Sequence, residues 1–379
     1  MDVITSTITL VISFIMAIGQ VLSPVGALIM AGGEDAFFTE WSATDEFGAD
    51  DYIELKKEPG KDFVMLNLAD IQLQDDEIYA KEGKYTFELI EKLVENTDPD
   101  LITLTGDNAW DTMSYLETIK LVDSFGIPWA PVMGNHDGQG CISEFWAAYH
   151  ISESENSIFE FGPADMGYGN YIVNITENGK IVHTVFFMDT HNNRDYTLED
   201  GTAVNGYDHL WENQMAWYEW AVKGIETLAG DTVPSTVYMH IPVVEYLDAW
   251  VKYMDGPYEF GTIDNKYHPT AIGSKYEVGG FPCHEAGDGT VTLFNNGFFS
   301  LCKRLGSTRD IIVGHDHVND FSILYEGIRL TYAVKTGFGS YWQPEFIGGT
   351  TVNINTQGTT TINQHYYDLA ENNWDVTDD

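Results

Sequence analysis

Residues 127–137, IPWAPVMGNHD, join an apolar run directly to a cluster of polar side chains. The first part, residues 127–133, has the composition of a strand that is buried on both faces. Gly134 then permits a sharp turn of the backbone. Residues 135–137 supply an amide, an imidazole and a carboxylate at that turn. These groups suit metal binding or proton transfer, although Asn-His-Asp alone is also typical of a surface turn.

Strand-like and helix-like segments alternate before this stretch. Residues 62–70 (DFVMLNLAD) and 100–108 (DLITLTGDN) are apolar runs of strand length. Residues 83–97 and 112–125 instead place apolar side chains at helical spacing. The order strand, helix, strand, helix, strand predicts βαβ units, and hence a largely parallel sheet.

The second half of the chain predicts further strands around a long helix. Asn178-Gly179 predicts a tight hairpin turn between two of these strands. Residues 245–300 show weak periodicity and are interpreted as a loop-bearing insertion near the site. The predicted strands are 168–176, 180–190, 235–243, 310–317, 320–327, 328–337 and an edge strand at 359–367, and the long helix is 209–229.

The composition excludes several classes of protein and partner. Fifty-nine acidic and 18 basic residues give a formal charge of -41, which argues against nucleic acid and anionic membrane surfaces as partners. Hydrophobic residues at 44% argue against a disordered chain. Three cysteines exclude a disulfide framework. A single Cys283–Cys302 bridge remains open if the protein is exported.

The first 33 residues predict where the protein is located. No charged residue lies between Val3 and Gly33, so residues 1–33 are interpreted as a signal peptide or a membrane anchor, the anchor running over residues 3–23. We therefore expect a secreted or extracytoplasmic protein. Residues 34–60 are expected to be an acidic linker or an edge element, residues 61–368 the folded domain, and residues 369–379 an acidic, loose tail.

Side chains that can bind metal recur where apolar strands end. Ligand sites of open α/β sheets lie beyond the carboxyl ends of the strands, so five strand ends would deliver these side chains to one crevice. The set contains nitrogen and oxygen ligands without sulfur, which suits Mn²⁺, Fe or Zn²⁺. The residues are Asp70 and Gln72, Asp107 and Asn108, Asn135, His136 and Asp137, His240, and His315 and His317.

This order of motifs resembles the calcineurin-like metallophosphoesterase superfamily. That superfamily carries Asp-x-His, Gly-Asp, Gly-Asn-His-Asp/Glu, a lone His and Gly-His-x-His. Segments 97–108, 126–137, 239–246 and 313–321 look closer still to the secreted fungal and plant phosphatases that are grouped with purple acid phosphatases. The resemblance implies an α/β fold, a four-layer α-β-β-α sandwich with mixed sheets. It also implies a dinuclear metal centre at the carboxyl ends of the strands.

The resemblance also implies a role for each residue. Asp107 would bridge two divalent or trivalent ions (Mn, Fe or Zn), and a hydroxide between them would attack a small phosphomonoester. His136 would protonate the leaving group, oriented by Asp137, and Asn108 would contact the phosphate. The first ion would be held by Asp70, Gln72, Asp107 and His317, and the second by Asp107, Asn135, His240 and His315.

Two residues depart from the pattern. Gln72 stands where most of the superfamily has a histidine, and an amide oxygen is a weaker ligand, or no ligand at all. Trp110 stands where the purple enzymes have a tyrosine ligand, so we expect no purple colour. Three alternatives therefore remain open beside a phosphomonoesterase. They are a phosphodiesterase or nucleotidase on the same centre, a metal-binding relative weakened by Gln72, and a surface adhesion module.

Overall fold

The computed structural model describes residues 19, 23–28, 30–139, 142–197, 201–254 and 295–376. Residues 1–18, which carry most of the predicted signal or anchor, lie outside this part, as do Cys141 and Cys283. Cys302 is buried and forms no disulfide with any described residue, so the open Cys283–Cys302 bridge stays a prediction. Among the described residues, no helix is long and apolar enough to cross a membrane.

One sheet contains the strands that the first half of the chain predicts. The strand order is β14-β13-β2-β3-β4. Strands β2, β3 and β4 run parallel, with Leu66 opposite Ile102 and Thr103 opposite Ala130, which confirms the predicted βαβ units. Strand β13 is antiparallel to β2, so the sheet is mixed. The bounds are β2 Phe63–Leu68, β3 Leu101–Leu104, β4 Trp129–Pro131, β13 Gly348–Ile354 and β14 Thr360–Tyr366.

A second sheet contains the later strands, in the order β1-β5-β6-β9-β10-β12-β11. Strands β6, β9, β10 and β12 run parallel to one another. Strands β5 and β6 form the predicted hairpin, with Asn178 and Gly179 at φ angles of 52° and 74°. The bounds are β1 Ile53–Lys56, β5 Tyr171–Glu177, β6 Lys180–Phe187, β9 Ser235–Tyr238, β10 Thr308–Val313, β11 Ser322–Tyr325 and β12 Ile328–Tyr332.

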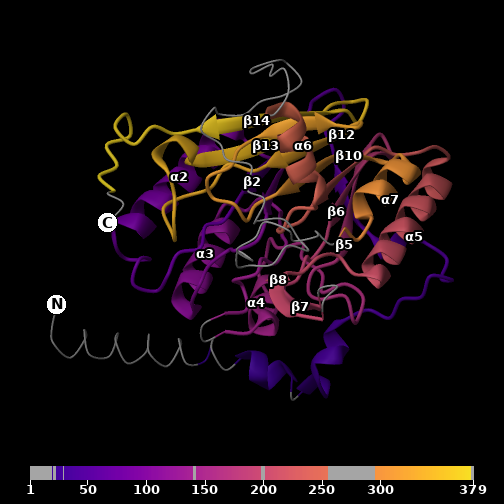
Figure 1. Ribbon diagram of the computed structural model, residues 1–379, viewed down its shortest axis with the longest axis horizontal. Coiled ribbons are helices and arrows are strands. Elements are labelled where there is room, and N and C mark those ends of the chain that lie inside the picture. Colours follow the sequence, from indigo (N-terminus) through magenta and orange to yellow (C-terminus); the bar gives the residue numbers. More distant parts are fainter. Residues whose placement is uncertain are drawn as a thin grey trace.

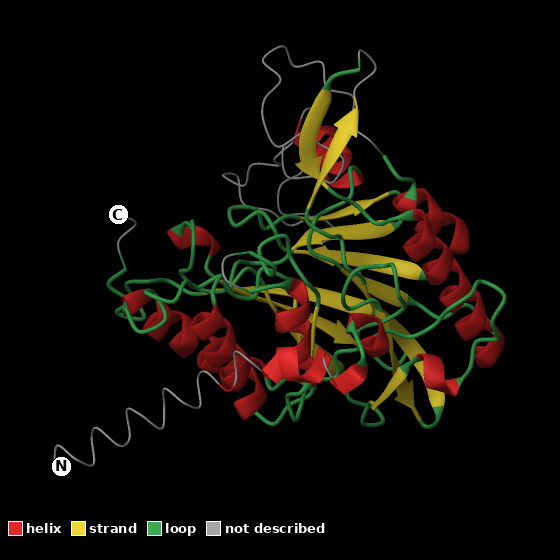
Figure 2. Cartoon of the chain, turned by 90° about the horizontal axis from the view of Figure 1, so that it is seen from below, coloured by secondary structure: helices red, strands yellow, loops and turns green. Residues whose placement is uncertain are grey.

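Alternating side chains of β6 show how the layers pack. Phe187 stacks on Tyr171 and belongs to the core that the two sheets share. Phe186 points the other way and contacts Tyr218 of a helix. Helices therefore cover the outer faces of two sheets that pack against each other, and Figures 1 and 2 show helices on both sides of the strands. This is the predicted four-layer α-β-β-α sandwich.

The helices divide between the two outer faces. Helix α2 packs on β2 and β13, and α3 lies beside α4. On the other face, α5 and α7 pack together, α7 against β10, and α6 contacts β11. The bounds are α2 Lys81–Thr97, α3 Thr112–Ser124, α4 Glu144–Ser152, α5 Glu212–Ala229, α6 Glu245–Met254 and α7 Phe298–Leu305, with short 3-10 helices η1 Glu34–Phe37, η2 Ala49–Asp51 and η3 Pro344–Phe346.

Several segments differ from the sequence prediction. Residues 34–60 contain the edge strand β1, which pairs with β5, and so behave as the edge element rather than as a free linker. The prediction of a loose tail is wrong for Trp374, which is 4% exposed and packs against Phe338 and Tyr367. Residues 245–254 form helix α6 instead of a loop, while residues 255–294 lie outside the described part.

Several elements were not predicted, namely helices α4 and α7 and strands β7, β8 and β13. Strand β13 starts with two glycines, which are depleted in strands. The segment therefore lacks the alternation of apolar and polar residues that would have predicted a strand. Strands β7 (Asn193–Thr197) and β8 (Ala203–Tyr207) form a separate two-stranded hairpin. Tyr207, at the end of β8, contacts the His315 ring edge-on at 4.4 Å between ring centroids. The hairpin therefore reaches the edge of the two sheets at which the candidate site lies.

Candidate metal centre

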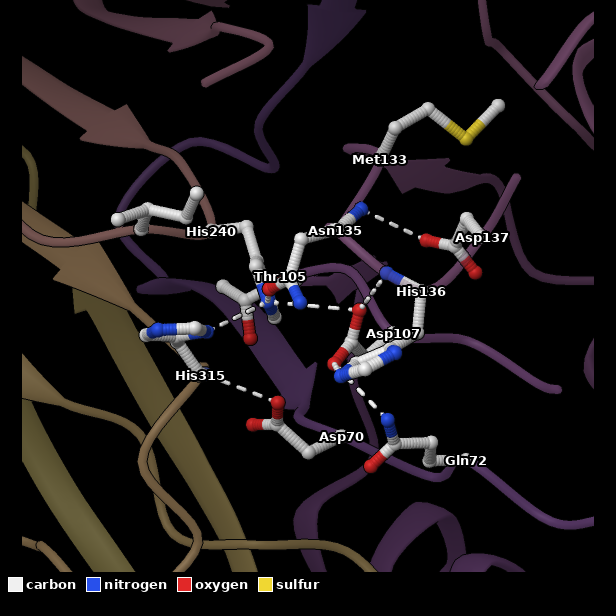
Figure 3. Close-up of polar contacts among 12 residues, drawn as sticks. Asp70, Gln72, Thr105, Asp107, Met133, Asn135, His136, Asp137, His240 and His315 are labelled. Carbon is white, nitrogen blue, oxygen red and sulfur yellow. Dashed lines mark hydrogen bonds and ion pairs between the residues drawn. The ribbon is translucent and has the colours of Figure 1, made fainter. Parts of the chain in front are cut away.

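The candidate ligands follow the carboxyl ends of strands from both sheets. Asp70, Asp107 and Asn135 come after β2, β3 and β4 of the first sheet. His240 comes after β9, and His315 after β10, of the second sheet. Because the two sheets pack face to face, these ends meet in one place, and Figure 3 shows the side chains converging on Asp107.

The backbone at this place is strained. Asp70, Gln72, Asp107 and His315 all have positive φ angles, of 53°, 42°, 50° and 77°. Such a conformation costs a non-glycine residue of order 1 kcal/mol or more, and it occurs mainly where the surrounding structure imposes it for function. Four of the predicted ligands are therefore held in conformations that the fold dictates.

Glycines of the motifs leave room for the carboxylates. A Cβ atom at Gly134 would lie 2.3 Å from Asp107 Oδ1, and one at Gly314 would lie 2.7 Å from Asp70 Oδ2. Any larger residue at either position would displace a carboxylate oxygen. Glycine is thus required at positions 134 and 314 by close approach, since neither residue has a positive φ angle.

We call Asn135, His240 and His315 the His240 side of the centre. Asn135 Oδ1 lies 3.0 Å and His315 Nδ1 3.2 Å from His240 Nε2. The carbonyl oxygen of Thr105 lies 2.7 Å from His240 Nδ1 and accepts its hydrogen bond. This bond fixes the ring and leaves Nε2 to face the other ligand atoms, as in histidines that bind metal.

We call Asp70, Gln72 and His317 the Asp70 side. The ligand atoms of Asp70, Asp107 and His317 lie within 4.8 Å of one another. His317 Nδ1 lies 2.7 Å from the Tyr341 carbonyl oxygen, which directs Nε2 towards Asp70 Oδ1 at 3.7 Å. Burial lowers the pKa of His317 well below its usual value, and the charge of Lys335 acts in the same direction. The imidazole is therefore neutral, as a metal ligand must be.

Asp107 lies between the two sides. Its Oδ1 is 3.4 Å from His240 Nε2, and its Oδ2 is 3.1 Å from Gln72 Nε2. Burial favours the protonated form of Asp107, but the charge and hydrogen bond of His240 outweigh it and hold the pKa below its usual value. Each oxygen of one ionised carboxylate thus faces a different ligand set, which is the geometry of a bridging ligand.

The negative potential of the centre also acts on His240. Burial lowers the pKa of this imidazole, yet the charges of Asp107 and Asp70 raise it to about 9. A buried site that attracts a proton so strongly carries surplus negative charge, and a metal cation would neutralise the same charge. The residues present therefore fit metal ions, on oxygen and nitrogen donors alone.

Gln72 is the exception among these ligands. Its Nε2 donates to Asp107 Oδ2, while its buried Oε1 has no hydrogen-bond partner among the described residues. A buried acceptor without a partner is costly. Rotation of the amide by 180° would turn Oε1 towards Asp107, and oxygen and nitrogen of an amide are assigned from their contacts. The orphaned oxygen is thus available to a cation, but only in the other orientation.

His136 lies at the open edge of the centre. Its side chain is 28% exposed, and its Nε2 is 4.0 Å from Asp107 Oδ2. The ring stacks on Trp110 at 4.4 Å between centroids, and Nδ1 lies 2.9 Å from Gln139 Oε1. The prediction that Asp137 orients His136 is wrong. Gln139 and Trp110 contact the imidazole, whereas the Asp137 carboxylate accepts hydrogen bonds from Gly134 and Asn108.

Asp137 and Asn108 hold the loops together instead. Asp137 accepts hydrogen bonds from the backbone N–H groups of Gly134 and Asn108 and from Asn108 Nδ2, at 2.7 to 2.9 Å. Burial raises the pKa of Asp137 to about 7, and the charge of Asp107 adds to this effect. Asn108 gives its other amide hydrogen to the Val132 carbonyl. Both donors of its side chain are used within the protein, so the predicted phosphate contact, which stays a prediction, would require Asn108 to give up one of these hydrogen bonds.

Two residues at the centre were missed from the sequence. Gln139 follows His136 by three residues within one turn, a spacing that brings side chains together. Lys335 is one of two charged residues, with Arg329, in the otherwise mostly apolar run 328–337, and its side chain is buried. Burial lowers the pKa of Lys335 to about 8, although Asp70 and Asp107 oppose this. Lys335 is therefore a cation at neutral pH. A charge that directly follows the apolar residues Tyr332, Ala333 and Val334 is the signal that could have identified it.

Comparisons with known proteins identify the family of this chain. A model of the calcineurin-like phosphoesterase family matches residues 63–319, more than half of the chain. A relative named "Probable inactive purple acid phosphatase 14", from Arabidopsis thaliana, is 28% identical over 68% of this chain and 63% of its own length. Phosphatase DCR2 of Saccharomyces cerevisiae is 29% identical over 64% of this chain and 40% of its own.

The chain thus spans less than two thirds of the length of these relatives. A crystal structure of a dimetal phosphatase from Danio rerio aligns with 80% of this chain and 98% of its own, at 11% identity and a TM-score of 0.43. That likeness is too low to bear on the site. The family model covers every motif from Asp70 to His317. The chain belongs to the calcineurin-like phosphoesterase family.

Proposed function

We propose that this protein is a metal-dependent phosphatase that hydrolyses small phosphomonoesters. One observation carries the proposal: the two oxygens of Asp107 face two ligand sets, one led by His240 and one by Gln72. A carboxylate shared in this way suits two cations held close together. Such a pair clamps the attacking and leaving oxygens of an in-line displacement at phosphorus.

The ligand assignment follows the two sides of the centre. Asn135, His240 and His315 would hold one ion, and Asp70, His317 and the rotated amide of Gln72 the other, with Asp107 shared. When bound, Mn, Fe or Zn ions would supply an activated water and neutralise charge on the phosphate. The nitrogen and oxygen donors suit Mn, Fe and Zn alike. The metal must therefore be identified by experiment, by measuring activity after metal-stripped protein has been reloaded with each ion.

His136 is proposed as the general acid. The oxygen of a hydroxide, formed when a water releases a proton to solvent, would bond to phosphorus as the ester P–O bond breaks, and His136 Nε2 would give its proton to the leaving oxygen. Gln139 Oε1, at 2.9 Å, accepts a hydrogen bond from Nδ1 in both protonation states. The stacked Trp110 ring keeps the imidazole in one plane. The partly exposed imidazole can thereby present Nε2 to a substrate.

A second candidate is a metal-binding relative with weakened catalysis. It is favoured by the Gln72 amide, whose N–H group rather than its oxygen faces Asp107. Export from the cytoplasm also remains a proposal, since it depends on residues 1–33. Hydrolysis of p-nitrophenyl phosphate against its bis ester separates a phosphomonoesterase from a phosphodiesterase or nucleotidase on the same centre.

The test is Asp107→Asn in protein stripped of metal and reloaded with Mn²⁺, Fe²⁺ or Zn²⁺. We expect loss of both ions by elemental analysis, and a fall in kcat/KM of more than about 1000-fold, since the shared ligand is removed. Asp165→Asn is the matched control, because Asp165 is exposed and also has a positive φ angle, of 62°. Full activity in Asp107→Asn, or an inactive wild type with every metal, would reject the proposed function.

A further inference from the structure

The chain crosses from one sheet to the other directly beneath the centre. Strand β12 of the second sheet ends at Tyr332, and β13 of the first sheet starts at Gly348. Between them, Lys335 forms parallel bridges to Ala69 and to Ile347. The N–H group of Thr336 donates to the Ala69 carbonyl oxygen at 2.8 Å. The crossing thus fixes the backbone of Lys335 next to the residue that precedes Asp70.

The Lys335 side chain is buried under the Asp70 side. It is 1% exposed, and its Nζ donates to the Asp70 carbonyl oxygen at 2.5 Å. An ammonium group has three donors. This is the one hydrogen bond that Nζ makes within the described part of the chain, where no carboxylate oxygen lies within 4.0 Å of it. The positive charge of Lys335 therefore lies near the centre, and no ion pair within the described residues neutralises it.

A second buried lysine shows the ordinary arrangement. Lys57 is 3% exposed, and its Nζ lies 3.3 Å from Glu177 Oε1, at the far end of the β5–β6 hairpin. That charge is neutralised by its own partner. Lys335, in contrast, acts on Asp70 and on His317, two of the residues assigned to the Asp70 side. Its charge is directed at the ligand set rather than at a structural partner.

We propose that Lys335 is a built-in positive charge that weakens cation binding on the Asp70 side, so that this side takes up its ion reversibly while the His240 side retains one. The inference rests on the proposed metal centre. Two like charges in a buried site repel strongly, because little water screens them. The same charge offsets Asp70 and Asp107 when no ion is present, and so stabilises the half-loaded centre. Lys335 is a positioning residue and touches no substrate.

The experiment measures ion affinity rather than turnover. Full-length, metal-stripped protein is titrated with Mn²⁺ by calorimetry, and free Mn²⁺ is counted by electron paramagnetic resonance. We expect wild type to bind one ion tightly and a second weakly. Lys335→Met should tighten the weaker ion at least tenfold and leave the tighter ion within about threefold, since the ammonium group contacts Asp70 and acts on the other side only through the shared Asp107. Lys335→Arg, which keeps the charge, should bind like wild type.

The controls separate charge from packing. Lys57→Met removes a buried lysine away from the centre and should change neither affinity. If Lys335→Met does not fold, as judged by circular dichroism, Lys335→Gln takes its place, because its amide retains a donor for the Asp70 carbonyl. An unchanged weak affinity in the uncharged variants would overturn the inference, as would an equal shift of both ions or a loss of the second ion.

These outcomes are distinct from failure of the proposed function. A wild type that binds no Mn²⁺ and hydrolyses no phosphoester would reject both. A wild type that binds two ions and hydrolyses phosphoesters, but whose weaker affinity ignores the charge at residue 335, would reject the inference alone.

Discussion

The His240 side and the Asp70 side use related ligands but differ in what lies behind them. Behind His240, the Thr105 carbonyl accepts a hydrogen bond from Nδ1. This bond fixes the orientation of the ring and makes the imidazole a stronger ligand. Behind Asp70, the carbonyl oxygen accepts from a buried ammonium, that of Lys335. One surrounding promotes cation binding, whereas the other opposes it. Two sites that share a carboxylate can therefore differ in affinity through residues that bind no metal.

The difference extends to the amide ligands. Asn135 presents its Oδ1 to His240 Nε2, at 3.0 Å. Gln72 presents its N–H group to Asp107 instead. Both are amides, and an amide binds a cation only through oxygen. Asn135 is thus already oriented for a cation, whereas Gln72 must rotate before it can serve as a ligand.

The largest expected effect comes from removing one histidine from each side of the centre and comparing the loss of ion affinity. His240→Ala should weaken the tightly held ion by more than about 100-fold and abolish turnover, since loss of a ligand exceeds the cost of losing a supporting hydrogen bond. His317→Ala should weaken only the second ion. Titration with Mn²⁺ and kcat/KM measure both, with His365→Ala on the edge strand β14 as the control. Equal losses in both variants would break the comparison.

A smaller effect concerns the acid, which belongs to neither side. His136→Ala should leave both ion affinities unchanged and lower kcat about 100-fold for an alkyl phosphate, because a general acid contributes 100-fold or more when the leaving group is poor. With p-nitrophenyl phosphate, whose leaving group needs little protonation, the loss should be much smaller. Identical losses for the two substrates would remove His136 from the role of acid.

The smallest effect is a gain on the Asp70 side. Gln72→His should tighten the second ion by about tenfold, since an imidazole replaces an amide that must first rotate. Affinity is measured by titration with Mn²⁺, and Gln74→His, two residues along the same loop, controls for an added histidine. No gain in Gln72→His, with the control unchanged, would mean that Gln72 does not limit this side.

Most of the first sheet, and the convergence of the candidate side chains at the strand ends, could be predicted from the sequence. Buried parallel strands are apolar on both faces, so residues 62–70 and 100–108 were recognisable without knowledge of their neighbours. Strand β13 escaped because its glycines carry no pattern, and because its place between β2 and β14 depends on a distant segment. Helix α6 escaped because residues 245–300 were interpreted as one unit.

The partners of the site residues were less accessible. Asp137 is next to His136 in the sequence, which favoured it as the orienting residue. The turn directs its carboxylate back to Gly134 and Asn108, however, and brings Gln139 to the imidazole. Neighbours along the chain at a tight turn point in different directions, and only the folded backbone decides which of them meet.

The sequence by itself determined which residues could form a metal centre, because a strand that ends in a turn must place its next polar side chain at the sheet edge. The tertiary structure alone decided how those residues are supported. Lys335 lies 265 residues from Asp70, and the path of the chain between the two sheets brings them together. That contact depends on the order of strands, a long-range property that no local pattern encodes.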